Sequence, residues 1–141
     1  MTSSKIIDKV KNDIAEHGWH VLSVSCSDSP NFSYTVGFEQ TLGHPEIIMS
    51  GLKIDLMHQL LNDIGGLIKE GESFTNGDLS NEVIRGFPVK FVALNENSTE
   101  EYLRVAKAHY ENGSIRALQC IWPDSNGVFQ SASNNAQELF G

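Results

Sequence analysis

The sequence of 141 residues contains only two cysteines, and no run of about 18 apolar residues occurs in it. A disulfide framework needs more cysteines, and a transmembrane helix needs a longer apolar run. The first ten residues alternate charged and apolar side chains, so they lack the apolar centre of a secretory signal. We therefore expect a cytoplasmic protein in which Cys26 and Cys120 are reduced.

Basic residues are also scarce, because 10 Lys and Arg stand against 18 Asp and Glu, and the net charge is −8. No Lys or Arg lies between Lys11 and Lys53. Phosphate backbones and anionic lipids attract proteins of the opposite charge balance. We therefore expect neither duplex nucleic acid nor a membrane as a partner. The interval without basic residues contains five acidic ones: Asp13, Glu16, Asp28, Glu39 and Glu46.

The composition, with 40% hydrophobic and 20% charged residues, is typical of one folded domain. Apolar residues at helical spacing predict three helices: 4–17, 54–70 and 98–111. Alternating or β-branched residues predict five strands and a short sixth one: 19–26, 32–38, 46–50, 87–94, 114–122 and 128–129. The first three strands have connections too short for parallel crossovers, which favours an antiparallel meander. The expected fold is α+β, with a mainly antiparallel sheet of five to six strands packed against two to three helices.

Several local features refine this expectation. Residues 1–129 form the expected domain, and the Ser- and Asn-rich segment 130–141 is expected to be a flexible tail. Residues 39–45 and 72–86 are expected to be loops, the second of them alternatively a weak hairpin. Ser98 is the expected N-cap of the third helix. Gly65 and Gly66 lie inside the second helix at a cost of roughly 2 kcal/mol, which close packing by a strand or a break in the helix would explain.

The strand 32–38 places four large side chains on one face, which we expect to point into the core. These side chains belong to Phe32, Tyr34, Val36 and Phe38. The opposite face carries only small residues and suits close packing by a helix or by a partner.

His44 and Glu46 lie two residues apart in the loop that follows this strand. An imidazole beside a carboxylate can act as an acid–base couple, with Tyr34 nearby and Asp124 as a further carboxylate. These four residues would then serve a small-molecule-binding or hydrolytic enzyme domain. The alternative, which residue chemistry favours, is a turn fixed by Pro45 with a solvated Glu46.

Local signatures of nucleotide binding, serine hydrolysis and zinc proteolysis are missing from the sequence. His17 and His20 have the spacing of a metal pair, but the two histidines alone are a weak signal, because a closed metal site needs further Cys, Asp or Glu ligands. We therefore expect no metal and no cofactor, and we expect no catalytic activity.

The loops near 27–31, 39–46 and 123–127 are expected to present carboxylates without compensating cations. The candidate partner-binding residues are Asp28, Glu39, Glu46 and Asp124. Such a surface suits a basic protein. The expected function is that of a small acidic binding protein, in its sharpest form an immunity-type inhibitor of a cationic nuclease toxin. Ordinary solubility explains the same charge excess and remains the alternative.

Three motifs occur in a specific order: Tyr34-Thr-Val-Gly37, Gly43-His-Pro-Glu46, and Trp122-Pro-Asp124 followed by Gly127 and Phe129. With the leucine-rich segment between them, they resemble a bacterial family of domains of unknown function. The resemblance runs from Trp19 to Phe129. The family tends to continue with proline and an aromatic residue, where this chain has Gln130 and Ser131. The resemblance implies that the three motifs form a shared structural or binding unit, and it carries over no catalytic residue.

Overall fold

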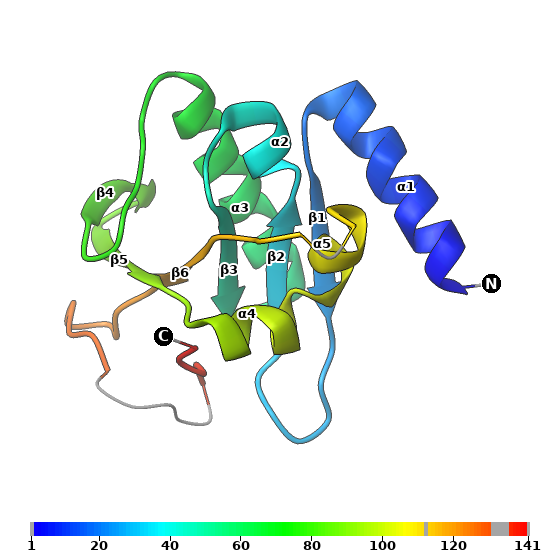
Figure 1. The fold of residues 1–141 in the computed structure, drawn as a ribbon. Helices are drawn as coiled ribbons and strands as arrows, with labels where there is room; N and C mark the ends of the chain where they lie inside the picture. The colour runs from blue at the N-terminus through cyan, green and yellow to red at the C-terminus, as the bar shows by residue number, and fades with distance from the viewer. Residues whose placement is uncertain (1, 112, 131–135, 141) are drawn as a thin grey trace.

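The computed structural model describes residues 2–111, 113–130 and 136–140. Six strands form one sheet in the order β1-β2-β3-β6-β5-β4, as Figure 1 shows. Neighbouring strands are antiparallel except β3 and β6, which are parallel. The sheet confirms the α+β prediction and the meander of the first three strands. The strands are β1 (His20–Val24), β2 (Phe32–Val36), β3 (Glu46–Ser50), β4 (Leu79–Ile84), β5 (Phe87–Ala93) and β6 (Ala117–Ile121).

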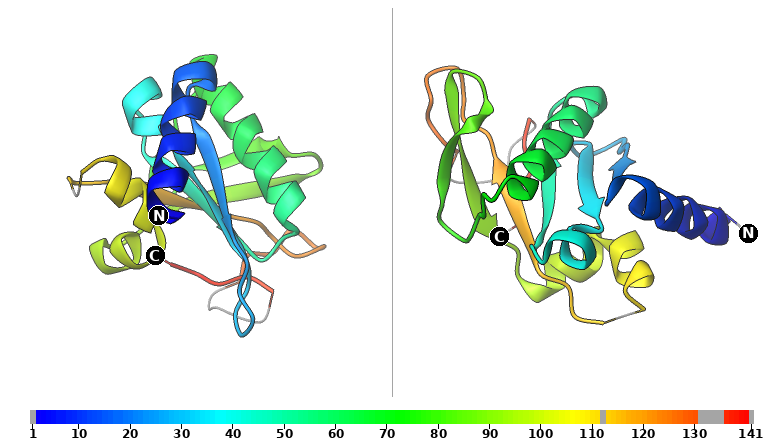
Figure 2. Two further views of the ribbon diagram at one scale, coloured as in Figure 1. Left: turned by 90° about the vertical axis from the view of Figure 1, so that its right-hand side faces the viewer. Right: turned by 90° about the horizontal axis from the view of Figure 1, so that it is seen from above.

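Five helices occur in the described residues, against two to three expected. The long helix α3 covers one face of the sheet, and α5 covers the other, with α1 packed beside β1 and α5 (Figure 2). Each of these helices is too short or too polar to cross a bilayer. The helices are α1 (Thr2–His17), α2 (Phe38–Leu42), α3 (Ile54–Lys69), α4 (Glu96–Tyr102) and α5 (Arg104–His109).

Strand β2 lies at the centre of the packing and is buried on both faces. Phe32, Tyr34 and Val36 pack against apolar residues of α1 and α5. Phe38 begins α2 and instead joins the cluster beneath α3. The small residues on the opposite face of β2 are fully buried, and α3 packs against this strand. The predicted close approach of a helix is therefore confirmed.

The two glycines in α3 have different surroundings. A Cβ on Gly65 would lie 2.4 Å from Trp19 Cζ2, whereas a Cβ on Gly66 would meet nothing within 4 Å. The Trp19 indole is fixed there, because its Nε1–H donates to Asn62 Oδ1 at 2.9 Å and its ring meets Phe38 edge-on. Gly65 therefore allows the close approach of Trp19, which directly precedes β1, whereas Gly66 has no such neighbour.

Replacing Gly65 with alanine is expected to destabilise the protein by about 1–3 kcal/mol, because the new methyl group overlaps the Trp19 indole. The matched control is Gly66→Ala, which should stabilise the protein by about 0.5–1 kcal/mol through helix propensity alone. Urea unfolding of both variants measures the difference. Equal effects at the two positions would contradict this packing.

The segment 39–45 contains a helix that its sequence does not predict. Gly37 and Gly43 adopt positive φ angles of 119° and 65° and bracket α2. The helix has only five residues, which is too short for an apolar periodicity to appear. The segment 72–86 contains β4, which pairs with β5 in the hairpin that was the alternative for this segment.

The third predicted helix is divided in two. Asn95, not Ser98, is its N-cap, and the Asn95 side chain accepts a hydrogen bond from the Ser98 N–H at 2.8 Å. The chain breaks at Leu103 between α4 and α5. The predicted N-cap was therefore wrong, because Asn95 places its acceptor one turn earlier.

The C-terminal segment 136–140 packs against the sheet, unlike the flexible tail that its composition predicts. Gln137 and Phe140 are buried. Gln119 of β6 holds the segment, since its Nε2 donates to the Glu138 carbonyl at 2.6 Å and its Oε1 accepts the Phe140 N–H at 2.9 Å. Residues 131–135 and 141 lie outside the described residues.

The predicted strand 128–129 was wrong, because the Asp124 N–H donates to the Val128 carbonyl within a turn.

Candidate functional site

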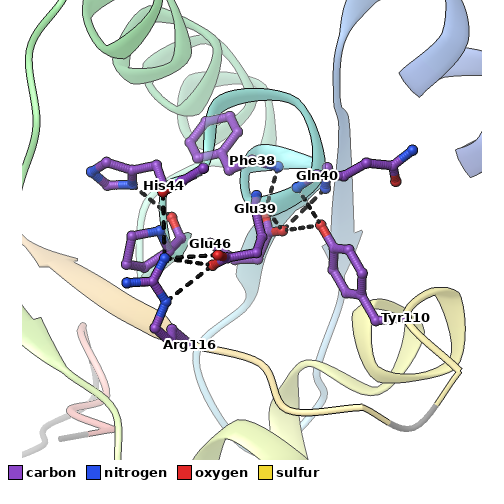
Figure 3. Close-up of polar contacts among 10 residues, drawn as sticks. Phe38, Glu39, Gln40, His44, Glu46, Tyr110 and Arg116 are labelled. Carbon is purple, nitrogen blue, oxygen red and sulfur yellow. Dashed lines mark hydrogen bonds and ion pairs between the residues drawn. The ribbon is translucent and has the colours of Figure 1, made fainter.

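The loop with the His-Pro-Glu motif joins α2 to β3, and its two ionisable side chains are both buried (Figure 3). Strand β2 ends at Val36, and Gly37 turns the chain into α2. Gly43 ends this helix and leads back into β3, which begins at Glu46 and pairs with β2. The first side chain of β3 therefore reaches beneath the first turn of α2.

Glu46 is completely buried, and its carboxylate accepts five hydrogen bonds. Three of them come from the first backbone N–H groups of the α2 region, so the carboxylate caps the positive end of this helix. The donors are Thr35 Oγ1 (2.7 Å), the N–H groups of Gly37 (3.2 Å), Phe38 (3.1 Å) and Glu39 (3.2 Å), and Tyr110 Oη (2.6 Å).

The two hydroxyl donors are oriented by other parts of the chain. Thr35 Oγ1 accepts the Ile47 N–H at 3.0 Å, and Tyr110 Oη accepts the Gln40 N–H at 3.4 Å. Burial raises the pKa of Glu46, while the hydrogen bonds from Tyr110 and Thr35 oppose this shift. Burial, with the neighbouring Glu46, also raises the pKa of Tyr110, which keeps the phenol protonated as a donor.

His44 is buried, and both of its ring nitrogens bind backbone groups. Nδ1 lies 2.8 Å from the Pro45 carbonyl oxygen, and Nε2 lies 3.0 Å from the Phe74 nitrogen, whose N–H it accepts. A carbonyl only accepts hydrogen bonds, so Nδ1 carries the proton and the ring is neutral. Burial lowers the pKa of His44, in agreement with this tautomer. The side chain therefore ties the loop before β3 to residue 74.

The free energy of unfolding should fall as the pH decreases below about 6.5, because the unfolded chain gains a proton that folded His44 resists. His44→Gln should remove this part of the slope, up to about 1.4 kcal/mol per pH unit. The lowered pKa of His109 and the raised pKa of Glu46 act in both proteins and cancel in the comparison. Denaturant titrations of both proteins between about pH 5 and pH 7 measure this difference in the pH dependence of the free energy of unfolding. Parallel pH profiles would contradict a neutral, buried His44.

The four residues of the alternative catalytic set do not converge on one site. In the described contacts no hydrogen bond joins His44 to Glu46, and the His44 ring points away from the carboxylate (Figure 3). The Tyr34 hydroxyl accepts the Val105 N–H at 3.0 Å, and burial raises the pKa of Tyr34 to about 12. Asp124 lies in the turn after β6, where its Oδ1 accepts two backbone N–H groups at 2.8 and 2.9 Å.

The four candidate partner-binding carboxylates are also dispersed. Glu46 is buried beneath α2, and Glu39 lies on α2 itself. Asp28 is exposed in the loop between β1 and β2, at the opposite end of the sheet from α2 (Figure 1). Asp124 is exposed in the turn after β6. The structure therefore brings only Glu39 and Glu46 together.

The segment 39–46 was expected to lack a compensating cation, but Arg116 supplies one. Arg116 Nη2 donates to Glu39 Oε1 at 2.7 Å and its Nε donates to Oε2 at 3.1 Å. The parallel pairing of β3 with β6 causes this, because it places Arg116 beside the start of β3, where the Glu46 N–H donates to the Arg116 carbonyl at 3.0 Å. Sequence patterns gave no signal for this pairing, whose partners, such as Glu46 and Ala117, are far apart in the chain.

One hollow lies beside the His-Pro-Glu loop and another beside the Trp-Pro-Asp turn. A cleft of about 960 Å³ is bounded by residues 43–45, the loop 73–76, the first turns of α4 and the segment 113–118. An apolar pocket of about 270 Å³ lies beside the Trp-Pro-Asp turn. No group of three or more potential metal ligands occurs in the described part of the chain.

A family model described as a domain of unknown function matches residues 13–134, most of the chain. The chain belongs to the DUF4262 family. The predicted resemblance to an uncharacterised domain family is thereby confirmed. No curated protein and no solved structure is significantly similar to this DUF4262 chain. The match spans all three motifs, so the buried Glu46 cap and the Trp-Pro-Asp turn both lie within the family region.

Proposed function

We propose that this DUF4262 protein is a small acidic cytoplasmic binding protein without catalytic activity, and that its partner is a basic protein. In the sharper form of the proposal, it is an immunity-type inhibitor that covers the basic active cleft of a toxin, such as a nuclease. Complementary charge would speed and orient this association.

The observation that carries the proposal is the unpaired negative charge on the surface. Among the described residues, Lys and Arg side chains pair with only three carboxylates: Asp13, Glu39 and Glu100. The chain has 18 acidic residues, and Glu46 is the one that is fully buried. Most acidic side chains therefore have no Lys or Arg partner within the described residues, Asp28 and Asp124 among them.

The buried motif supports a binding role over acid–base chemistry. Both ring nitrogens of His44 are hydrogen-bonded to backbone groups. The Glu46 carboxylate already accepts five hydrogen bonds. A general acid or base must reach the proton that it transfers within about 2.6–3.2 Å or through one water. For His44 or Glu46 to do so, the fold would have to give up these contacts.

Affinity capture from the protein's own cells, followed by reconstitution with the identified partner, tests this function. We expect a partner with a net positive charge. The dissociation constant of the complex should increase by at least tenfold between about 50 and 500 mM salt. For a nuclease partner, one equivalent should stop cleavage. An acidic partner, or an affinity that salt does not change, would contradict the proposal.

A second candidate function is binding of a small molecule, which the cleft of about 960 Å³ favours because residues 43–45 line it. The exposed Ser114 also lines this cleft. A ligand that raises the melting temperature of the wild-type protein should have no effect on Ser114→Trp, whose indole would fill the cleft. An equal shift in both proteins would place the ligand elsewhere.

A further inference from the structure

The pocket beside the Trp-Pro-Asp turn is formed by three segments that are far apart in the sequence. They are the start of α3, the β4–β5 turn, and the chain that follows β6. Its volume of about 270 Å³ is small, and almost all of its lining is apolar. Its lining includes Leu56, Phe87, Trp122, Asp124 and Ser125.

Large apolar side chains around this pocket remain exposed, although most others are buried. Leu56 is 43% exposed and Phe87 is 36% exposed. Val128, which closes the turn at Asp124, is 60% exposed. Apolar side chains that gather on a surface in this way mark interaction sites more often than isolated ones do.

One wall of the pocket, Trp122, is held by hydrogen bonds to two other parts of the chain. Trp122 Nε1–H donates to the Ser50 carbonyl at 2.7 Å, and the Trp122 N–H donates to Gln137 Oε1 at 3.1 Å. Trp122 is thus held to β3 through its indole and to the C-terminal segment through its backbone N–H. A rigid wall loses little conformational entropy on binding.

Asp124 is the charged residue that lines the pocket. Its Oδ1 accepts the N–H groups of Asn126 and Val128, which holds the carboxylate in place. No donor from the described residues reaches Oδ2, so this oxygen can accept from a partner. Lys53 and Arg85 are neighbours of lining residues in the sequence, but neither lines the pocket.

We propose that this pocket receives an apolar side chain of the basic protein partner, next to a Lys or Arg of that partner that pairs with Asp124 Oδ2. The proposal rests on the proposed function and names the surface and chemistry of the contact. An apolar anchor in a rigid pocket with a charge at its rim has the arrangement of an interface hot spot.

A second copy of this chain is a poorer occupant. Two molecules with a net charge of −8 each repel one another. The pocket also has the volume of about one or two large side chains, whereas a stable dimer buries about 800 Å² on each partner. A basic partner meets both the apolar lining and the carboxylate.

Titration with short peptides, followed by NMR of the full-length protein, tests the pocket. The probe is acetyl-Lys-Phe-Lys-amide, and the controls are acetyl-Glu-Phe-Glu-amide and acetyl-Lys-Ala-Lys-amide. We expect saturable shifts of the Trp122 indole N–H and of the Phe87 and Ser125 amides. Both controls should bind at least fivefold more weakly, because each lacks one half of the recognised chemistry.

Variants separate the pocket from the rest of the surface. Leu56→Glu should abolish these shifts, and Asp124→Asn, which keeps the Oδ1 acceptor of the turn, should weaken binding by at least threefold. Leu79→Glu is the matched control, because Leu79 is 64% exposed on β4 and does not line the pocket. It should bind like the wild-type protein.

The outcomes distinguish this inference from the proposed function. Shifts that map outside the pocket, equal binding of the three peptides, or a dimer that Leu56→Glu dissociates would each overturn the inference. If a basic partner is captured and binds Leu56→Glu as tightly as the wild-type protein, the inference fails and the proposed function stands. If the peptide binds in the pocket but the captured partner is acidic, the proposed function fails.

Discussion

Glu46→Ala should lower the free energy of unfolding by about 3–5 kcal/mol, an effect large enough to unfold many domains of this size. The substitution leaves the hydroxyls of Thr35 and Tyr110 and three backbone N–H groups without their acceptor in a buried site. Each unsatisfied buried group costs about 1–3 kcal/mol before the site relaxes. Helix α2 also loses the negative charge at its N-terminal end.

Chemical unfolding followed by circular dichroism measures this effect. The control is Tyr110→Phe, which removes one of the five donors and should cost about 1–2 kcal/mol. Hydrogen exchange should become faster first at the N–H groups of Phe38 and Glu39 in the Glu46 variant. A loss in Glu46→Ala no larger than that in Tyr110→Phe would show that the carboxylate does not organise this loop.

Gly51→Ala is expected to release the C-terminal segment from the sheet. Gly51 has a φ angle of 90°, and a Cβ there would lie 1.6 Å from the Ala136 carbonyl oxygen. This neighbour is backbone, so a side-chain rotation cannot relieve the overlap. Displacing the segment removes Phe140 from between Phe32 and Tyr102, and we expect a loss of about 3–5 kcal/mol.

The control for this variant is Gly77→Ala. Gly77 has a φ angle of 92°, but a Cβ there would meet nothing within 4 Å. It should therefore report only the backbone strain of about 1–2 kcal/mol. Limited proteolysis should cleave Gly51→Ala within the C-terminal segment while the rest of the domain remains resistant. Equal stability and equal proteolysis of the two variants would contradict the packing of residues 136–140.

Sequence patterns were sufficient to predict elements whose own residues carry a clear apolar periodicity, either along a long helix or along an alternating strand. The apolar periodicity of α3 and the alternation of β2 gave both elements close to their observed bounds. Helix α2 was missed because a carboxylate from β3, Glu46, caps it. The residues of the helix itself carry no sign of this contact. The packed C-terminal segment was missed because its anchor, Gln119, lies in another element.

The candidate site shows the same limit. The sequence places His44 and Glu46 in one loop, but the expected solvated Glu46 was wrong, because the fold buries both side chains. Tyr110 is 64 residues from Glu46 and carries no motif, so only the fold reveals it as a donor. Arg116 reaches Glu39 only because β3 and β6 are parallel neighbours. Charge counting along the chain therefore overstated the free negative charge of this loop.

The dissociation constant of the complex with the captured partner, compared between His44→Gln and Asp124→Asn, tests the central claim most directly. If the buried motif is structural and the surface binds the partner, folded His44→Gln should retain wild-type affinity, and Asp124→Asn should bind at least threefold more weakly. Loss of binding in His44→Gln with unchanged affinity in Asp124→Asn would contradict the account and return the function to the His-Pro-Glu loop.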